Sequence, residues 1–352
     1  MKKINPKTLV ILILILLTCA TIGGTLIILK NPWGVLDTYP EIVLPITDCG
    51  TQNVAIEFPF QSDVVKGSVD LKLAPYIGAQ KAEKEARLYG DSVKNSDWMK
   101  NYYLAVTNDP ALEDVYSKLT AFFKDYAASH NLTDDEYVEL VTLYVQNIPY
   151  KTTDINTKFP VETVIDNWGD CDDKSVLLAG LLSYAGFDTA LASFQDHMTG
   201  AIMMKNGNYV LIETTSVMYI GDTPDPEKNG GIDLSTPLGM YKIGNGTKVY
   251  HSNDEVNTIL SARDTLTAER KDLEEKMREL EVRMAEQKRL IDEKDDEILI
   301  PFYNYNVDKY NEYAARYNDV GKALARIYDE PYNRKGVYEA VKNIQGASDS
   351  AE

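Results

Sequence analysis

Apolar residues are spaced differently in successive parts of the chain, and this spacing predicts five regions. Residues 9–29 (LVILILILLTCATIGGTLIIL) form an uncharged apolar run about as long as a bilayer-spanning helix, so 1–30 is expected to be a cytoplasmic tip and membrane anchor. The prolines and short apolar stretches of 31–75 indicate a linker with short strands. The remaining regions are a folded domain over 76–252, a coiled-coil helical hairpin over 253–330 and a partly disordered tail over 331–352.

Within the folded domain, the pattern predicts helices first and an antiparallel sheet afterwards. Thr133 and Glu136 form a capping box at the start of an amphipathic helix that ends near Pro149. A strongly apolar helix follows Cys171. Three β-like runs come next, over residues 189–194, 197–204 and 209–214. This order predicts an α+β fold.

The coiled-coil prediction rests on a seven-residue repeat. Leu266, Leu273 and Leu280 recur at this interval among mostly charged residues. After Pro301, a second helix carries an apolar stripe rich in tyrosine. We expect this helix to fold back along the first as an antiparallel hairpin with its turn near Pro301, because an interior proline costs a helix about 3 kcal/mol. The alternative is one straight helix that dimerises in parallel, and either form offers a surface for a coiled-coil partner or for self-association.

The charges beside the apolar run predict how the chain is placed in a membrane. Lys2, Lys3 and Lys7 precede the run, whereas Lys30 follows it alone. The positive-inside rule then leaves the N-terminus in the cytoplasm and the bulk of the chain outside, as in a single-pass membrane protein. A cleaved signal peptide is the alternative, although its apolar core usually spans only about 7–15 residues.

The overall charge and the few cysteines narrow the functional classes. A net charge of −18 argues against nucleic-acid binding, which needs a basic surface to replace phosphate counterions. The three cysteines, Cys19, Cys49 and Cys171, are too few for a disulfide scaffold. A bridge between Cys49 and Cys171 remains an alternative, and it would silence Cys171 as a nucleophile.

We expect no metal and no cofactor. The three histidines, His130, His197 and His251, do not stand at metal-ligand spacing, and the chain has no CxxC pair. The acidic loop over 221–235 partly matches a calcium-binding loop. However, Thr236 stands where a closing glutamate is needed and Pro226 intrudes, so a solvated loop is the preferred interpretation.

One constellation points to nucleophilic chemistry. Cys171 lies in the segment WGDCDDKS, on a glycine-containing turn at the start of an apolar helix, where backbone amides and the helix dipole favour a thiolate. The neighbouring aspartates oppose this effect, so the thiolate needs a nearby cation. His197 begins the second β-like run and Glu213 ends the third, so adjacent strands can join the imidazole and the carboxylate.

The length of the connection between these two strands decides whether that pair forms. A two-residue turn at Asn206 and Gly207 would place Glu213 on the opposite sheet face from His197. The pair therefore requires an odd connection or a β-bulge. If Glu213 faced away, Asp196 or Asp222 would have to supply the acid.

These motifs together resemble the transglutaminase-like superfamily, which has a papain-type thiol fold. The segments that carry the resemblance are NIPY (147–150), PVET (160–163), GDCDD (169–173), LLAGLL (177–182), His197-Met198, YVLIETT (209–215) and YIGD (219–222). It covers about residues 110–222 and looks most like a prokaryotic, membrane-anchored branch. The chain departs from the wider family in having Glu213 where an aspartate is usual and Thr199 where an aromatic residue often stands.

The resemblance implies a function and a set of roles. Cys171 would be the nucleophile, His197 the base and Glu213 the orienting acid. The implied activity is that of a cysteine hydrolase or acyl-transferase acting on peptide or amide bonds, with a peptide or protein as substrate. The alternative is a non-catalytic cell-surface scaffold that binds a partner through its coiled coil and uses the thiol domain to bind peptides.

Overall fold

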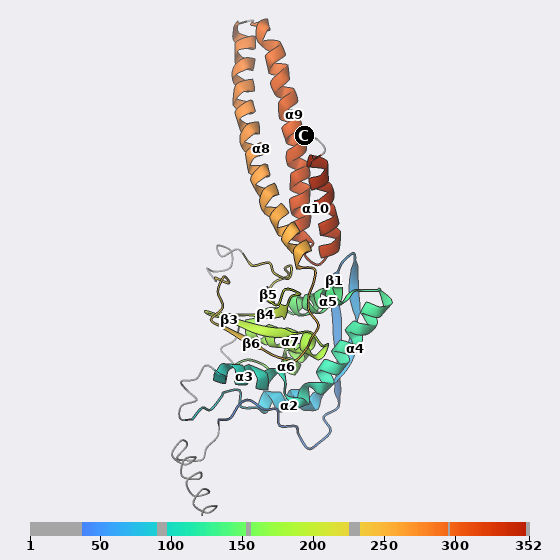
Figure 1. The fold of residues 1–352 in the computed structure, drawn as a ribbon. Coiled ribbons are helices and arrows are strands. Elements are labelled where there is room, and N and C mark those ends of the chain that lie inside the picture. The colour runs from blue at the N-terminus through green and yellow to red at the C-terminus, as the bar shows by residue number, and fades with distance from the viewer. Residues whose placement is uncertain (1–36, 90–96, 153–155, 225–232, 295, 350–352) are drawn as a thin grey trace, which may run out of the picture.

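The molecule combines a mixed helix-and-sheet core with a long helical hairpin, so the fold class is α+β as predicted. The computed structural model describes residues 37–89, 97–152, 156–224, 233–294 and 296–349. The hairpin projects from one end of the core, and the last helix lies beside its base (Figure 1).

A long β-hairpin covers one side of the core. Strands β1 (Thr51–Phe60) and β2 (Asp63–Lys72) are antiparallel and joined by two residues. The alternate side chains of β1 from Val54 to Phe60 are buried, and the Phe58 ring contacts the rings of Phe123 and Tyr144. The strands expected over 31–75 are therefore present, but they are longer than predicted and belong to the core rather than to a linker, because the period-two pattern of β1 buries one face against helices.

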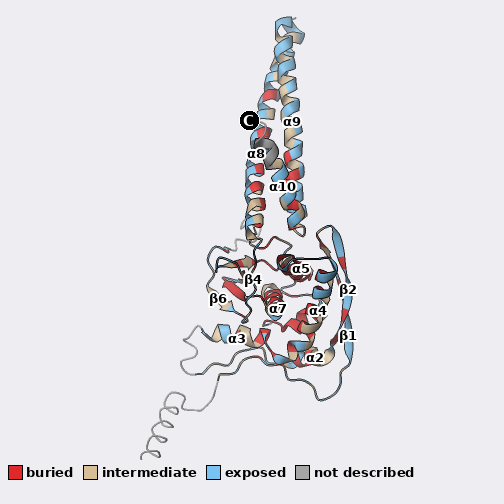
Figure 2. Cartoon of the chain, turned by 45° about the vertical axis from the view of Figure 1, so that its right-hand side comes forward, coloured by how far each residue is buried: buried red, intermediate tan, exposed pale blue. Residues whose placement is uncertain are grey.

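The helices of the core surround one that is almost wholly buried. They are α2 (Leu73–Lys81), α3 (Asp97–Thr107), η2 (Pro110–Leu112), α4 (Glu113–Ser129), α5 (Asp134–Asn147), α6 (Pro160–Asp166) and α7 (Cys171–Tyr184). The capping box of Thr133 and Glu136 opens α5, as predicted. Every residue of α7 from Asp173 to Leu182 is buried, which explains why the helix is apolar without interruption from Val176 to Leu182 (Figure 2).

A four-stranded antiparallel sheet packs against α7. Its strands are β3 (Thr189–Phe194), β4 (His197–Met203), β5 (Tyr209–Ile212) and β6 (Gly239–Lys242), in the order β5-β4-β3-β6. The first three agree with the three predicted β-like runs to within two residues. Gly200 of β4 allows the close approach, because a Cβ there would lie 3.0 Å from a Leu178 methyl group of α7.

The antiparallel helical hairpin predicted from the two apolar stripes is present. Helices α8 (Asn253–Lys294) and α9 (Ile300–Asp329) pack side by side, with Lys276 over the ring of Tyr313 and Gln287 bonded to Asn306. The turn lies earlier than predicted, because η3 (Glu297–Leu299) precedes α9. Pro301 falls in the first turn of α9, where a missing N–H costs no helical hydrogen bond.

The end of the chain is more ordered than the sequence pattern indicated. Residues 334–349 form helix α10 (Arg334–Asp349), whereas a partly disordered tail was expected over 331–352. Val337 and Val341 are buried against α8 and α9. The prediction missed this helix because its apolar stripe is narrow and its surroundings are polar.

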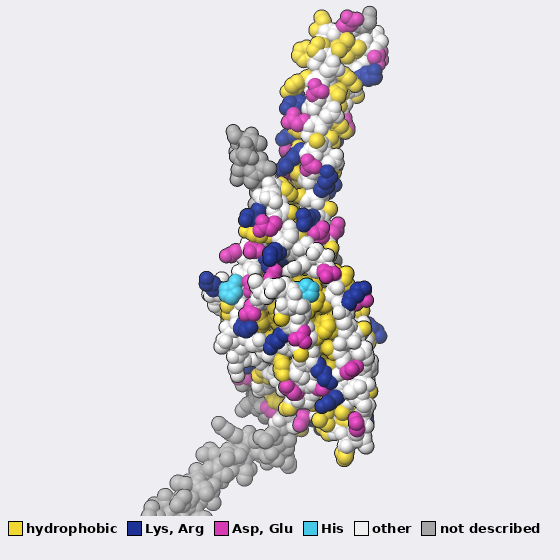
Figure 3. Space-filling view, turned by 90° about the vertical axis from the view of Figure 1, so that its right-hand side faces the viewer, with side chains coloured by type: hydrophobic (Ala, Val, Ile, Leu, Met, Phe, Trp, Pro, Cys, Tyr) yellow, Lys and Arg dark blue, Asp and Glu magenta, His cyan; other side chains and the backbone are white. Residues whose placement is uncertain are grey.

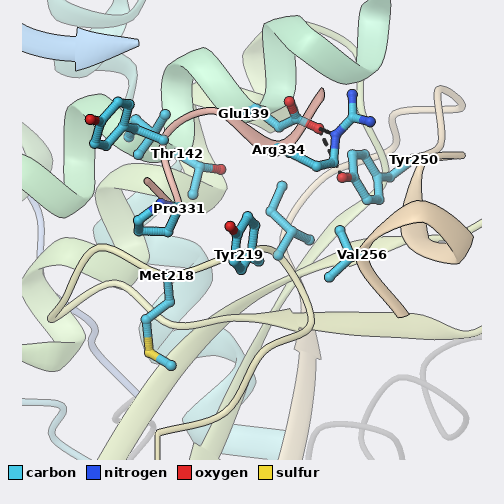
Figure 4. A pocket seen from close by; sticks show the side chains of 11 residues that line it. Glu139, Thr142, Met218, Tyr219, Tyr250, Val256, Pro331 and Arg334 are labelled. Atoms are coloured by element: carbon cyan, nitrogen blue, oxygen red, sulfur yellow. Dashed lines mark hydrogen bonds and ion pairs between the residues drawn. The ribbon is translucent and has the colours of Figure 1, made fainter. Parts of the chain in front are cut away.

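Buried polar contacts fix the base of the hairpin to the core. Arg334 of α10 donates to Glu139 of α5 at 2.5 Å and also pairs with Glu255 of α8. The Tyr250 hydroxyl donates to the same Glu139 carboxylate at 3.0 Å. Figure 4 shows Arg334, Glu139 and Tyr250 converging on a small cavity, which Tyr219 and Pro331 also line. A buried charge that is paired in this way holds two elements in a single arrangement.

Two predictions concern residues outside the described ranges. The apolar run over 9–29 and most of the acidic loop, 225–232, are not described, so the membrane anchor and the solvated loop stay predictions. None of the helices described here has both the length and the apolar character that a membrane span requires. Cys49 and Cys171 both carry free thiols, so the alternative of a bridge between them is not present.

The β-hairpin gives the fold a direct test. Replacing Phe58, which is 2% exposed, by alanine should lower the free energy of unfolding by about 3–5 kcal/mol, because it leaves a cavity between β1, α4 and α5. Val64 is on the same hairpin but 44% exposed, so Val64→Ala should change stability by less than about 0.5 kcal/mol. Urea unfolding measures both, and equal effects would contradict the packing of β1 on the core.

Candidate active site

Cys171 is the first residue of α7, and the local sequence explains its position. The Asp170 side chain caps the helix by accepting the N–H of Asp173 at 3.2 Å, and the Asp173 carboxylate accepts the N–H of Asp170 in return. Gly169 permits this turn, since a Cβ there would lie 2.8 Å from the Asp173 Cβ. The thiol is thus held at the N-terminal end of a buried helix.

The structure brings His197 and Glu213 together. His197 opens β4, and Glu213 follows the last residue of β5. The His197 Nε2 and Glu213 Oε2 atoms are 2.9 Å apart, and the two side chains are only 6% and 2% exposed. A contact that short and that well shielded from water constrains the orientation of the imidazole ring.

The contact depends on the strand register. Five residues, 204–208, connect β4 to β5. The Met204 N–H donates to the Asn208 carbonyl at 2.8 Å, so the turn inside this pair holds three residues, 205–207, of which Gly207 takes a φ of +84°. Gly200 of β4 pairs with Ile212 of β5. In the same register, the next residues along, Thr199 and Glu213, lie opposite each other. Since Thr199 and His197 are two residues apart, His197 and Glu213 share a face. The odd connection that the pair requires is present.

The protonation of this pair follows from its contacts. Burial pushes the pKa of Glu213 upward, but hydrogen bonds from His197 and Thr215 outweigh it, and the pKa lies below its ordinary value. An ionised carboxylate only accepts hydrogen bonds, so Nε2 of His197 must donate. The other ring nitrogen, Nδ1, is left as the atom that can accept a proton.

Cys171 rests as a thiol. Burial raises the pKa of Cys171 to about 12, and the charge of Asp172 adds to this effect, while the N–H of Met198 opposes it. The sulfur donates to Asp172 Oδ1 at 3.4 Å and makes no hydrogen bond to His197. Burial, together with the aspartates beside the thiol, thus outweighs the helix N-terminus, which was expected to favour the thiolate.

Cys171 and the His197–Glu213 pair are nevertheless neighbours. The Met198 N–H that acts on Cys171 belongs to the residue directly after His197. Ser175, one turn into α7, donates to the Met198 carbonyl at 3.2 Å and lies 3.0 Å from the Thr214 hydroxyl, next to Glu213. The first turn of α7 is therefore fastened to both strands that carry the pair.

Aromatic and polar side chains surround the thiol. Burial raises the pKa of both Tyr103 and Tyr150, and each phenol lies close enough to Cys171 for a thiolate there to raise its pKa further. Tyr103 stacks on Tyr241 with ring centroids 5.6 Å apart, and Tyr150 is about half exposed. Trp168 instead lies against two lysines, with the Lys158 ammonium 2.7 Å from its ring centroid.

Sequence reasoning missed two buried polar residues beside the site. Lys174 is fully buried, and burial lowers its pKa to about 8. It donates to the carbonyls of Gln146 and Ile148 at the end of α5. Gln146 in turn contacts the segment after β5. A lysine inside an otherwise apolar helix was the signal that could have revealed them, because burying an ammonium is costly unless it has partners.

Other assignments considered for the site have different roles. Asp222 is held by Arg263 of α8 at 2.9 Å, and Asp196 occupies the tight turn between β3 and β4, with φ +58°. Asp170, Cys171 and Asp172 form the one group of potential metal ligands found among the described residues. Their facing atoms are already bonded to a helix N–H, to each other and to the Thr157 hydroxyl, so no metal needs to be invoked there.

Comparisons of the chain with protein-family models, curated proteins and solved structures find no match. The resemblance to the transglutaminase-like superfamily therefore rests on the motifs quoted above, over about residues 110–222. The geometry of Cys171, His197 and Glu213 stands independently of that resemblance.

The acidity around the thiol gives a pH prediction. In a chain with Cys19 and Cys49 replaced by serine, Asp172→Asn should lower the pKa of Cys171, because it removes a charge that disfavours the thiolate. At a fixed pH well below that pKa, a pKa that is lower by about one raises the thiolate fraction about tenfold. The pH dependence of alkylation by iodoacetamide measures this.

A matched control removes an acid of the same kind far from the thiol. Asp319 on α9 is 67% exposed, so Asp319→Asn should leave the alkylation profile unchanged. An unchanged profile in Asp172→Asn as well would show that Asp172 does not govern the thiol.

Proposed function

We propose that the chain is a membrane-tethered, extracytoplasmic cysteine hydrolase or acyl-transferase of the transglutaminase-like type, acting on peptide or amide bonds. The observation that carries this proposal is the buried hydrogen bond between His197 and Glu213, formed beside the nucleophile helix at the one strand register that permits it. A histidine packed for structural reasons alone would not need an ionised acid on one ring nitrogen, at the start of the strand whose Met198 N–H acts on Cys171.

The reaction begins with a change of partner at the thiol. Cys171 turns from Asp172 toward Nδ1 of His197 and gives up its proton there, which yields a thiolate and an imidazolium. Glu213 stabilises the imidazolium through Nε2. The stabilised imidazolium compensates for an environment that otherwise keeps Cys171 protonated.

The thiolate then attacks the substrate carbonyl carbon. The carbonyl π electrons move to oxygen, and the N–H of Cys171 at the start of α7 is the available donor to that oxyanion. As the C–N bond breaks, His197 returns its proton to the departing amine and a thioester remains on Cys171. Water completes hydrolysis, whereas a second amine completes acyl transfer, with His197 taking the proton in either case.

A non-catalytic scaffold is the second candidate, and two observations favour it. The resting Cys171 is a protonated thiol bonded to Asp172. The distal end of the hairpin exposes Ile298, Phe302 and Tyr305, which form an apolar patch there (Figure 3). Such a patch on a projecting hairpin suits contact with another protein.

A thiol-reactive peptide amide distinguishes the two candidates. Labelling of Cys171 should fall about 10²–10⁴-fold in His197→Ala, because the proton acceptor is lost. His130→Ala serves as the control, since His130 lies at the end of α4 and bonds to Ser129. Mass spectrometry quantifies the labelling of Cys171 in both variants. Equal labelling of the parent chain and His197→Ala would refute the proposed enzymatic function.

The proposed location has its own test. Lys322 on α9 is 79% exposed, so an amine reagent that cannot cross membranes should modify it on intact cells. Modification of Lys322 only after permeabilisation would mean that the hairpin faces the cytoplasm, contrary to the charge distribution around residues 9–29.

A further inference from the structure

The segment that carries Glu213 has little support from its own backbone. Glu213 leaves the sheet directly after β5, and its carboxylate accepts the N–H and the hydroxyl of Thr215 at 2.8 and 2.6 Å. Among the described residues, the main-chain N–H groups of 214–218 donate to no main-chain carbonyl. An irregular segment of this kind depends on side chains from elsewhere to hold it in place.

One side chain of α5 supplies that support. Gln146 is 4% exposed, and its Nε2 donates to the main-chain carbonyl of Glu213 at 2.8 Å and to that of Met218 at 3.1 Å. A single amide group therefore fastens both ends of the segment. The carbonyl that it holds belongs to the same residue whose carboxylate binds His197.

The position of Gln146 is tied to the nucleophile helix. Lys174 stands three residues after Cys171, and its ammonium donates to the main-chain carbonyls of Gln146 at 3.1 Å and Ile148 at 2.7 Å. Lys174 is fully buried, so these bonds are not exchanged with water. A continuous chain of contacts thus runs from α7 through the end of α5 to Glu213.

The orientation of the Gln146 amide is not interchangeable. Its oxygen, Oε1, is buried without a hydrogen-bond partner, which is unfavourable. Rotating the amide would place this oxygen against two carbonyl oxygens, which cannot donate. The site at this position therefore requires a donor, and neither glutamate nor an apolar side chain replaces it.

We propose that Gln146 is a positioning residue that holds the Glu213 carboxylate against Nε2 of His197, with Lys174 fixing Gln146 from the nucleophile helix. The catalytic meaning of this role rests on the function proposed above, but the positioning itself does not. Without the two bonds from Gln146, the segment 213–218 moves and the hydrogen bond between Glu213 and His197 weakens.

The test reads that hydrogen bond directly. The His197 Nε2–H should give a resolved imidazole signal in NMR spectra of the full chain, because it is buried and bonded to Glu213. Gln146→Met keeps the size of the side chain and removes the donor. Its Nε2–H should exchange with water about tenfold faster, as expected for the loss of one hydrogen bond of ordinary net strength.

A matched control loses a different amide contact. Asn108 donates to the main-chain carbonyl of Ile243 at 2.9 Å, away from Glu213, so Asn108→Leu should leave the His197 signal unchanged. Gln146→Asn is the substitute if the apolar variant folds poorly. Its side chain keeps an amide but is too short to reach both carbonyls, so it should give the same faster exchange of the His197 Nε2–H as Gln146→Met. Thermal unfolding of each variant confirms that the folded state is compared.

A double-mutant cycle separates positioning from a general loss of stability. Alkylation of Cys171 near neutral pH should fall about tenfold in Gln146→Met, but should not fall further when Glu213→Gln is already present. Two results would overturn the proposal. One is an unchanged exchange rate of the His197 proton in both Gln146 variants; the other is a fall in Cys171 alkylation on Gln146→Met that is equal in the parent and in Glu213→Gln. Should Cys171 cleave no amide at all, the proposed function fails while the exchange measurement still decides the role of Gln146.

Discussion

The site depends on the register between β4 and β5. His197 and Glu213 are sixteen residues apart in sequence, and their contact at 2.9 Å exists because an odd rather than an even number of residues connects the strands. A shift of one residue would turn Glu213 to the other sheet face. Other features serve this register: Gly207 permits the turn, Gln146 fixes the segment after β5, and Ser175 fastens α7 to the start of β4.

The surroundings of Cys171 disfavour the thiolate that the proposed chemistry needs, unless His197 takes part. Asp170 and Asp172 flank Cys171, and burial together with their charge raises the pKa of the thiol to about 12. In the proposed mechanism, an imidazolium held by Glu213 is the local cation that reverses this preference. Cys171 would then stay protonated at rest and would need His197 to become a thiolate, which makes the Glu213 contact the controlling interaction of that mechanism.

Much of the core and of the site could be read from local patterns, and the misses have physical causes. The capping box of α5, the three runs that became β3, β4 and β5 and the two helices of the hairpin were predictable because each has a strong period or cap. Short strands were expected before residue 75, but the length of β1 and β2 and their packing on the core were missed, as was α10. A proline-rich approach to β1 and a narrow apolar stripe on α10 give little sign of surfaces that become buried only in the folded protein. Gln146 and Lys174 could not be assigned, because their partners are main-chain carbonyls brought together by the fold.

The separation between Cys171 Sγ and His197 Nδ1 in an acylated or aldehyde-bound state tests the role of the His197–Glu213 pair most directly. A crystal structure of the chain with a peptidyl aldehyde on Cys171 provides it. The proposed mechanism predicts that the sulfur leaves Asp172 and that Nδ1 lies within about 3.5 Å of it, while Nε2 stays on Glu213. A sulfur that remains beside Asp172, or an Nδ1 that faces away from it, would contradict the role assigned to the pair.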